Sequence, residues 1–270
     1  PRTPFGEEEP MGRLDDRVAL VTGGSRGLGE GIARHLAAEG AIVVCADVID
    51  ATEVASSLPA SPSGRKGKAV HLDVTNTPEV DEVIADVGRE FGSLDILCNN
   101  AGVAHPIAHV VDTPDEVIER VFAVNVRGVI ACTRAAARLM KEQRRGRIIN
   151  TASQVGKTAW PDWGVYSASK AAVIAITQVT AVELAPWNVR VNAVCPGTML
   201  TNMTRTGMSG YLKDDMTLEQ MIQDKEATIP LQRLGTPDDI GNLCVFLASD
   251  ECSFTTGAAI NLTGGEMVSF

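Results

Sequence analysis

Tyr166 and Lys170 are the two residues of this chain whose types and spacing most clearly suggest chemistry. They lie four positions apart in GVYSASKAAVIAIT, residues 164–177, so one helical turn would place both side chains on the same face. A phenol has a pKa of about 10, and a neighbouring ammonium lowers that pKa by stabilising the phenolate. Such a pair can take a proton from an alcohol while hydride leaves, or return it during reduction of a ketone. The alternative is a tyrosine packed on a sheet, with a surface lysine one turn away.

Three further polar positions favour the chemical interpretation. Ser153 follows GRIINT, residues 146–151, and NNAG, residues 99–102, comes directly after the run LDILCN. In open parallel sheets ligands bind beyond the carboxyl ends of the strands, so the Ser153 hydroxyl could orient a substrate carbonyl. Asn125 lies in an apolar helical stretch, where asparagine has low helix propensity and needs hydrogen-bond partners.

A glycine-rich loop in TGGSRGLG predicts a binding site for a dinucleotide. Gly23, Gly27 and Gly29 form a GxxxGxG array between a strand-like run and a helix-like stretch. Glycines there permit a tight turn, and the helix N-terminus offers free N–H groups to a pyrophosphate. The loop is not a Walker motif, because Gly29 is followed by Glu30 rather than by lysine. The alternative is a loop that only turns a strand into a helix.

The choice between NAD and NADP depends on two residues with opposite charges. Asp47 ends the second strand-like run, where an acid can bind the ribose hydroxyls of adenosine and would repel a 2'-phosphate. Arg26, inside the glycine loop, could instead bind that phosphate. Asp47 lies where the ribose is expected, so we expect NAD as the cofactor, with NADP less favoured.

The elements that would position these residues alternate between strands and helices. Near-continuous apolarity is typical of strands buried on both faces, and such alternation implies right-handed crossovers. The sequence therefore predicts an α/β, doubly wound Rossmann fold: a single parallel sheet of about seven strands with helices on both faces. Thr77, Thr113 and Thr236, each followed by proline and then by acids, are expected to begin helices as N-caps. The seven strand-like runs are residues 17–22, 41–46, 68–72, 94–99, 146–151, 189–194 and 258–262.

Composition limits the possible partners and the location. The formal net charge of -10 argues against nucleic acid or an anionic membrane surface as a partner. The apolar runs fall short of the roughly 20 residues that span a bilayer, so we expect no membrane span. Six scattered cysteines without a CxxC pair predict free buried thiols in a reducing, cytoplasmic location. Residues 1–12 are expected to be a disordered tail or an expression remnant, and residues 13–270 a single domain.

Residues 14–265 resemble the short-chain dehydrogenase/reductase family, in its single-domain branch. The matching elements are TGGSRGLG, Asp47, LDV with Asp73, NNAG, Asn125, Ser153, the Tyr166/Lys170 pair and PGTMLT at 196–201. One departure is Thr263, at a position where the family often has aspartate, and this weakens inference about contacts at that end.

The resemblance implies a role for each matching residue. Tyr166 would be the general acid/base, Ser153 would orient the substrate, and Lys170 would lower the tyrosine pKa and bind the nicotinamide ribose. Asn125 would anchor a water in a proton relay to that lysine. The positions that the resemblance assigns to the cofactor are Gly23, Ser25, Arg26, Gly27, Leu28, Gly29, Asp47, Asp73, Val74, Asn99, Ala101, Gly102, Tyr166, Lys170, Pro196, Gly197, Met199 and Thr201.

The substrate pocket is less well defined by the sequence. The segment from about residue 202 to about residue 230 lacks strand character. It is rich in methionine, whose side chain adapts to irregular apolar partners. The resemblance places a mobile, substrate-covering segment here; a surface helix with ordinary packing is the alternative. Candidate pocket residues are Gln154, Trp160, Trp163 and Met203, although both tryptophans could equally staple a loop. His105 and His109 lack further ligands, so no metal site is expected.

The main hypothesis is an NAD(H)-dependent oxidoreductase that interconverts a secondary alcohol and a ketone on a small or medium, partly apolar substrate. An NADPH-dependent 3-ketoacyl-thioester reductase of the same family is the first alternative, and Arg26 supports it. The second is a sensor that binds NAD(H) without catalysis, although such a protein has no need of a proton route. The helices around Asn125 and Tyr166 look apolar on more than one face, and with the resemblance this predicts a homotetramer.

Overall fold

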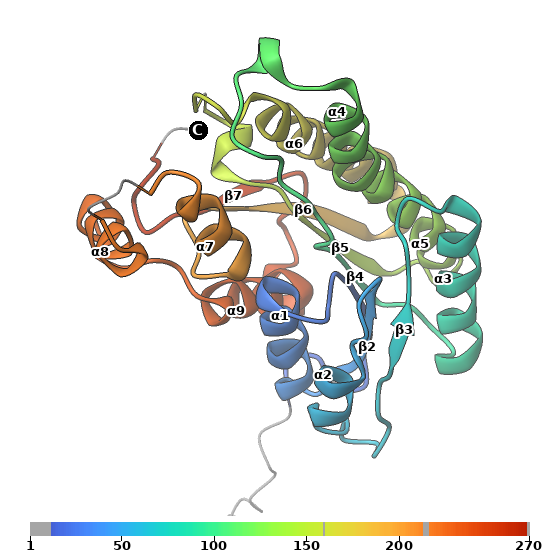
Figure 1. The fold of residues 1–270 in the computed structure, drawn as a ribbon. Coiled ribbons are helices and arrows are strands. Elements are labelled where there is room, and N and C mark those ends of the chain that lie inside the picture. Colours follow the sequence, from blue (N-terminus) through green and yellow to red (C-terminus); the bar gives the residue numbers. More distant parts are fainter. Residues whose placement is uncertain (1–11, 159, 213–215, 269–270) are drawn as a thin grey trace, which may run out of the picture.

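The computed structural model describes residues 12–158, 160–212 and 216–268. The tail expected at residues 1–12 therefore lies outside the described residues except for Gly12. Between these limits strands and helices alternate along the chain, as Figure 1 shows.

Seven parallel strands form the sheet, in the order β3-β2-β1-β4-β5-β6-β7. The predicted fold class is confirmed, and every strand-like run of the sequence overlaps one of these strands, although β2 and β6 extend beyond their runs by one and two residues. The order reverses between β1 and β4, so loops leaving these two neighbours run in opposite directions and open a crevice at their carboxyl ends. The strands are β1 (Val18–Thr22), β2 (Ile42–Asp47), β3 (Ala69–His71), β4 (Ile96–Asn99), β5 (Gly146–Thr151), β6 (Val189–Pro196) and β7 (Ala259–Leu262).

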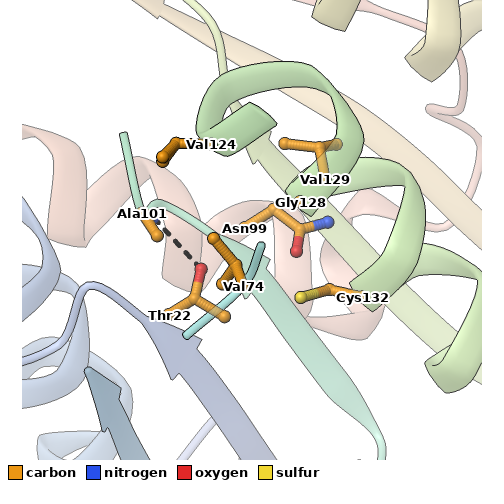
Figure 2. Close-up of a pocket in the computed structure, with 8 residues that line it drawn as sticks. All are labelled: Thr22, Val74, Asn99, Ala101, Val124, Gly128, Val129 and Cys132. Carbon is orange, nitrogen blue, oxygen red and sulfur yellow. Dashed lines mark hydrogen bonds between the residues drawn. The ribbon is translucent and has the colours of Figure 1, made fainter. Parts of the chain in front are cut away.

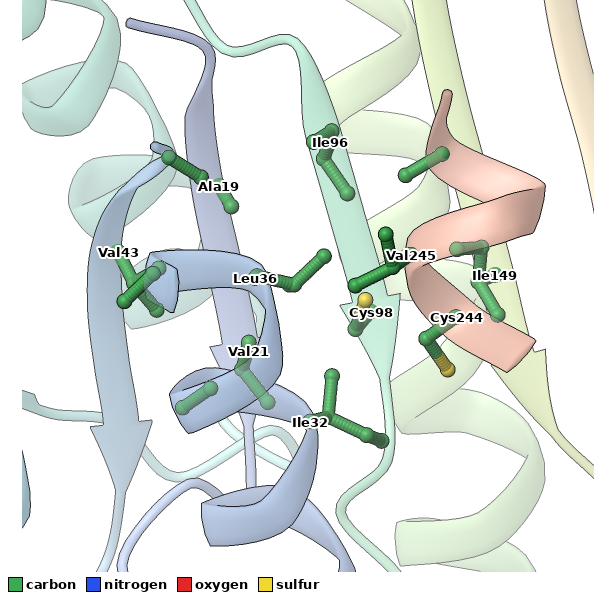
Figure 3. Packing of buried hydrophobic residues seen from close by; sticks show 14 of the residues in the cluster. Ala19, Val21, Ile32, Leu36, Val43, Ile96, Cys98, Ile149, Cys244 and Val245 are labelled. Atoms are coloured by element: carbon green, nitrogen blue, oxygen red, sulfur yellow. The ribbon is translucent and has the colours of Figure 1, made fainter. Parts of the chain in front are cut away.

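Helices cover both faces of the sheet because successive side chains of each buried strand point to opposite sides. Ala19 and Val21 of β1 pack with α1 and α9, and Figure 3 shows Ile32 and Leu36 of α1 in this cluster. Leu20, between them, packs on the other face with α3, α5 and α6. The helices are α1 (Gly27–Ala38), α2 (Thr52–Ser57), α3 (Thr77–Phe91), α4 (Asp115–Phe122), α5 (Val129–Gln143), α6 (Gly164–Leu184), α7 (Asn202–Ser209), α8 (Leu218–Thr228) and α9 (Pro237–Ala248).

One of the three predicted helix starts is confirmed and two are wrong in detail. Thr236 caps α9, with Pro237 as its first residue and Asp239 completing a capping box. For α3 the cap is Asn76, whose side chain accepts a hydrogen bond from Glu79, so Thr77 is already inside the helix. Thr113 does not cap α4: its hydroxyl donates to the carbonyl of His109 (2.9 Å), and α4 begins two residues later.

The segment of about 202–230 contains the short helices α7 and α8, which lie outside the helical layers at one end of the sheet (Figure 1). The six cysteines are free and buried, as the sequence predicted. By length and composition alone, residues 164–187 could cross a membrane, although the core helix of a soluble protein meets the same criterion. In the structure this stretch begins with α6, which packs against β6.

Candidate active site

The glycine loop connects β1 to α1 in a shape that side chains would prevent. Gly23 and Gly27 have φ angles of +66° and +59°, in the left-handed region that favours glycine. At Gly29 a Cβ atom would lie 1.9 Å from the carbonyl oxygen of Gly23, so no larger residue fits there without a shift. The loop thus brings bare backbone to the N-terminus of α1, which is the geometry that a pyrophosphate needs.

Thr22 and Asn100, which the sequence interpretation did not single out, join this loop to the end of β4. The Asn100 amide Nδ2 donates to the carbonyls of Thr22 (3.1 Å) and Gly23 (3.2 Å). In return, Thr22 Oγ1 accepts from the backbone N–H groups of Asn100 (3.0 Å) and Ala101 (3.1 Å). The signal for Asn100 was present in NNAG, but only the fold shows that its partner is the glycine loop.

A narrow hollow lies beside this junction, on the side of α5 (Figure 2). Three predicted cofactor residues, Val74, Asn99 and Ala101, line it. The amide of Asn99 lies between the sheet and α5, where it donates to Asn150 Oδ1 of β5 (2.8 Å) and to Thr133 Oγ1 of α5 (3.0 Å). The full lining is Thr22, Val74, Asn99, Ala101, Val124, Gly128, Val129 and Cys132.

Asp47 ends β2 directly beside the glycine loop. Its Oδ2 accepts hydrogen bonds from the backbone N–H (3.1 Å) and the hydroxyl (2.6 Å) of Ser25. Arg26 is exposed, and among the described residues it makes no ion pair. The carboxylate is therefore held at the loop, whereas the guanidinium is free to move. Asp73, beyond β3, accepts hydrogen bonds from Thr75.

The segment after β6 also reaches the glycine loop. Pro196 ends β6, and the Gly197 N–H donates to the carbonyl of Leu262 (2.9 Å). Thr201 caps α7, and its methyl group would lie 4.0 Å from a Cβ atom on Gly27. Met199 is buried in the core beneath, so only its backbone can face a cofactor.

Ser153, Tyr166 and Lys170 come together beyond β5. Ser153 stands at the start of a single 3-10 turn, residues 154–156, and its hydroxyl lies near that of Tyr166. Lys170 is buried one turn further along α6, and its Nζ donates to the carbonyl of Thr151 (2.7 Å). That Nζ lies 5.7 Å from the centre of the Tyr166 ring. The predicted pair does share one helix face, with the serine opposite.

The expected lowering of the Tyr166 pKa is not found. Burial raises the pKa of the Tyr166 phenol to about 12, and the nearby Ser153 hydroxyl opposes this effect. Burial likewise lowers the pKa of the Lys170 ammonium to about 8. The physical reason is that desolvation disfavours both charged forms, while the ammonium is directed to the Thr151 carbonyl rather than to the phenol. In the chain alone, the tyrosine is therefore a protonated acid at neutral pH.

Asn125 lies in a π-helical turn, residues 123–128, between α4 and α5. Its amide exchanges hydrogen bonds with the backbone of Val103 (2.8 and 2.9 Å) and donates to Ser169 Oγ (3.0 Å). A Cβ atom on Gly102 would lie 3.4 Å from both Asn125 Oδ1 and Lys170 Nζ. Asn125 and Lys170 thus flank the loop that follows β4.

The four predicted pocket residues divide into two groups. Trp163 lies edge-on to Tyr166, with ring centres 5.8 Å apart, and its Nε1 donates to the hydroxyl of Tyr211 (3.2 Å). Met203, on α7, is exposed. Gln154 instead lies near Glu266, and the ring of Trp160 lies near the ammonium of Lys225.

Two aromatic neighbours of Trp163 were missed or set aside in the sequence. Tyr211 follows α7, and nothing in its local pattern indicates a contact with Trp163. His105 is buried, its ring centre lies 6.0 Å from that of Trp163, and its Nδ1 is 2.6 Å from the Pro106 carbonyl oxygen. His109 instead pairs at the surface with Asp162 (3.2 Å).

The residues present fit a nicotinamide dinucleotide: a glycine cradle at a helix N-terminus, an acid at the end of β2, and hydroxyls with a lysine beyond β5. Which of them touch the cofactor stays a prediction. The chemistry that this arrangement supports is proton transfer by Tyr166 beside a hydride carrier.

Comparison with known proteins gives a consistent result. Residues 23–266 match a family model described as enoyl-(acyl carrier protein) reductase. Galactitol 2-dehydrogenase from Agrobacterium fabrum is 37% identical, with 95% of this chain and 100% of the relative covered. Meso-2,3-butanediol dehydrogenase from Serratia marcescens is 38% identical, with coverage of 95% and 97%. A 3-oxoacyl-[acyl-carrier-protein] reductase from Thermotoga maritima is 36% identical, with coverage of 95% and 100%.

A solved structure extends the likeness to three dimensions. The crystal structure of a candidate short-chain alcohol dehydrogenase from Sinorhizobium meliloti 1021 superposes with a TM-score of 0.86 at 33% identity. The match covers 97% of this chain and 100% of that one. With the glycine loop, the sheet order and the Ser153, Tyr166 and Lys170 arrangement already described, these matches are decisive. The chain belongs to the short-chain dehydrogenase/reductase family and is an oxidoreductase of that family.

Proposed function

We propose that this protein is an NAD(H)-dependent oxidoreductase that interconverts a secondary alcohol and a ketone. The observation that carries the proposal is the grouping of Ser153, Tyr166 and the buried Lys170 beyond β5, where the Lys170 Nζ donates to the Thr151 carbonyl and lies 5.7 Å from the centre of the Tyr166 ring. Two relatives, named for galactitol and for 2,3-butanediol, support a secondary alcohol as the substrate class.

In this proposal each side chain has a defined task. Bound nicotinamide supplies or accepts the hydride. Tyr166 gives its phenolic proton to the carbonyl oxygen during reduction and takes it back during oxidation, while the Ser153 hydroxyl holds the same substrate oxygen. A phenol with a pKa of about 12 is protonated at neutral pH, so the free enzyme is prepared for reduction. Oxidation needs nearby positive charge to lower that pKa, which a bound oxidised nicotinamide would supply.

Replacing Tyr166 by phenylalanine tests the acid/base assignment. General acid–base catalysis increases the rate by a factor of about 10² to 10⁴. We therefore expect kcat/KM for ketone reduction to fall by a factor of at least about 10². The dissociation constant for NADH, measured by fluorescence titration, should stay nearly constant because the ring is retained. For comparison, Tyr211→Phe removes the other tyrosine hydroxyl of the chain, which accepts from Trp163, and should change KM for the ketone more than kcat. Near-normal turnover of Tyr166→Phe would overturn the assignment.

The preference for NAD rests on Asp47. Its carboxylate is fixed by Ser25 beside the glycine loop and would repel the 2'-phosphate of NADPH. We expect wild type to use NADH with the higher kcat/KM. Asp47→Asn removes the charge but retains an acceptor for Ser25. In this variant the ratio of kcat/KM with NADPH to kcat/KM with NADH should rise about tenfold. A strong NADPH preference of the wild type would contradict the NAD proposal.

A second candidate is an NADPH-dependent 3-ketoacyl-thioester reductase. Arg26 is exposed and lacks an ion pair within the described part of the chain, so it could bind a 2'-phosphate. The Thermotoga maritima relative carries a name of this class. Assays of acetoacetyl thioester with NADPH, beside butanone and 2,3-butanediol with NADH and NAD, separate the two candidates. The Arg26→Ala variant should lose activity only if the second one is right.

We also propose that α7 and α8 cover the substrate. Both helices stand outside the helical layers, and Tyr211, directly after α7, touches Trp163 beside the proposed acid/base residue. A homotetramer built on α5 and α6, in a cytoplasmic location, completes the proposal.

A further inference from the structure

Glu266 is a buried carboxylate that no part of the proposed reaction uses. It follows β7, after two glycines with positive φ (Gly264, +61°, and Gly265, +91°), and its side chain is only 7% exposed. Thr263 shapes this turn, because its carbonyl accepts from the Glu266 N–H (3.0 Å) and its hydroxyl donates to the carbonyl of Met267 (3.0 Å). A fixed turn thus carries a charge into the protein, which is costly unless that charge is paired.

Two partners from separate segments satisfy this carboxylate. Lys225, in the last turn of α8, places its Nζ 2.5 Å from Oε1. Thr198, in the loop after β6, donates its N–H to Oε2 (3.0 Å) and its hydroxyl to Oε1 (3.0 Å). Gln154, next to Ser153, lies near the carboxylate and helps to lower its pKa. One side chain therefore joins the proposed cover to the proposed cofactor loop.

The charge state of Glu266 is consistent with this role. Burial alone would raise the pKa of its carboxyl, but the hydrogen bonds from Lys225 and Thr198 outweigh burial and lower the pKa overall. The ammonium of Lys225 is in turn restrained, because it lies 5.0 Å from the centre of the Trp160 ring. Removing one partner of such a pair leaves a poorly compensated charge, so the consequences should be large.

We propose that Glu266 is a positioning residue: through Lys225 and Thr198 it couples the docking of α8 to the placement of the loop at residues 196–201. The inference rests on the proposed function for the roles of these two segments. Binding of a cofactor at the loop then stabilises α8 over the substrate, and release of α8 loosens the loop.

Kinetics of Glu266→Gln and Lys225→Met give the first test. With the coupling broken, we expect KM for the ketone and the dissociation constant for NADH to rise about tenfold each, with a smaller change in kcat. The double variant should be no worse than the worse single variant, because both changes break one unit. The control is Lys68→Met, which removes a Lys–Glu pair of the same length, Lys68 with Glu90, that is exposed. That variant should leave all constants unchanged.

Hydrogen exchange followed by mass spectrometry tests the coupling without measuring turnover. In wild type, NADH should slow exchange in α8, which contains no predicted cofactor residue, and this protection should vanish in Glu266→Gln. Equal protection in both proteins, or a variant that loses thermal stability with unchanged KM and NADH affinity, would reduce Glu266 to a structural ion pair. A wild type that binds NADH but turns over no alcohol or ketone would overturn the proposed function alone.

Discussion

Lys170 shows how burial reverses a simple expectation about one residue. The spacing in the sequence predicts that a lysine lies near Tyr166, and the structure places it on the same helix face. The sequence does not give the depth of burial, and desolvation moves the pKa of Tyr166 up and that of Lys170 down. Proximity was thus predictable from the spacing, whereas the sign of the pKa shift depends on which other segments cover the pair.

The lowered pKa of Lys170 makes a prediction about stability and pH. The folded-state pKa of about 8 is below the ordinary value of 10.5, so between these values the unfolded chain binds more protons. Stability therefore rises from pH 8 to pH 10.5, and below pH 8 the charged lysine carries its full penalty. We expect Lys170→Met to raise the free energy of unfolding at pH 7 by roughly 1–3 kcal/mol while abolishing turnover.

Urea unfolding of the cofactor-free protein at pH 7 and pH 10 checks this prediction. The advantage of Lys170→Met should shrink at pH 10, because the wild-type lysine is then largely neutral in the folded state. Ala171→Met, at the adjacent exposed position of α6, controls for the added methionine. A variant that is less stable than wild type at pH 7 would contradict the sign, and would show that the hydrogen bond to Thr151 outweighs desolvation.

At the scale of elements, the sequence predicted what is local. Strand positions followed from short apolar runs, and Thr236 followed from its capping pattern. Asn76 was missed because the Thr-Pro signal one residue later obscured it. Contacts between distant segments carried no such signal: Asn99 with Asn150 and Asn100 with Gly23 are set by the order of the strands, and Lys225 with Glu266 by the place where α8 packs. The catalytic candidates were visible because they recur in a motif, while the residues that position them were not.

At the scale of the whole molecule, α5 and α6 leave an apolar surface on the outside. Val179 and Val182 of α6 are 57% and 76% exposed, and Ile130 of α5 is 44% exposed. Only 33% of the apolar stretch that begins with α6 is buried. Contiguous exposed apolar side chains mark interaction sites. Because α6 also carries Tyr166 and Lys170, a partner subunit packed on its outer face would restrain the position of both residues.

We therefore expect the wild type to be a tetramer in solution and Val182→Lys to reduce its mass in light scattering. A lysine there would have to be desolvated against the partner, which costs several kcal/mol if the charge is unpaired. Turnover should fall with dissociation and recover at high protein concentration, because loss of the partner loosens α6. Val111→Lys is the matched control, since Val111 is 89% exposed but lies outside both helices. A monomeric wild type, or a Val182→Lys protein with unchanged mass, would show that this surface faces water.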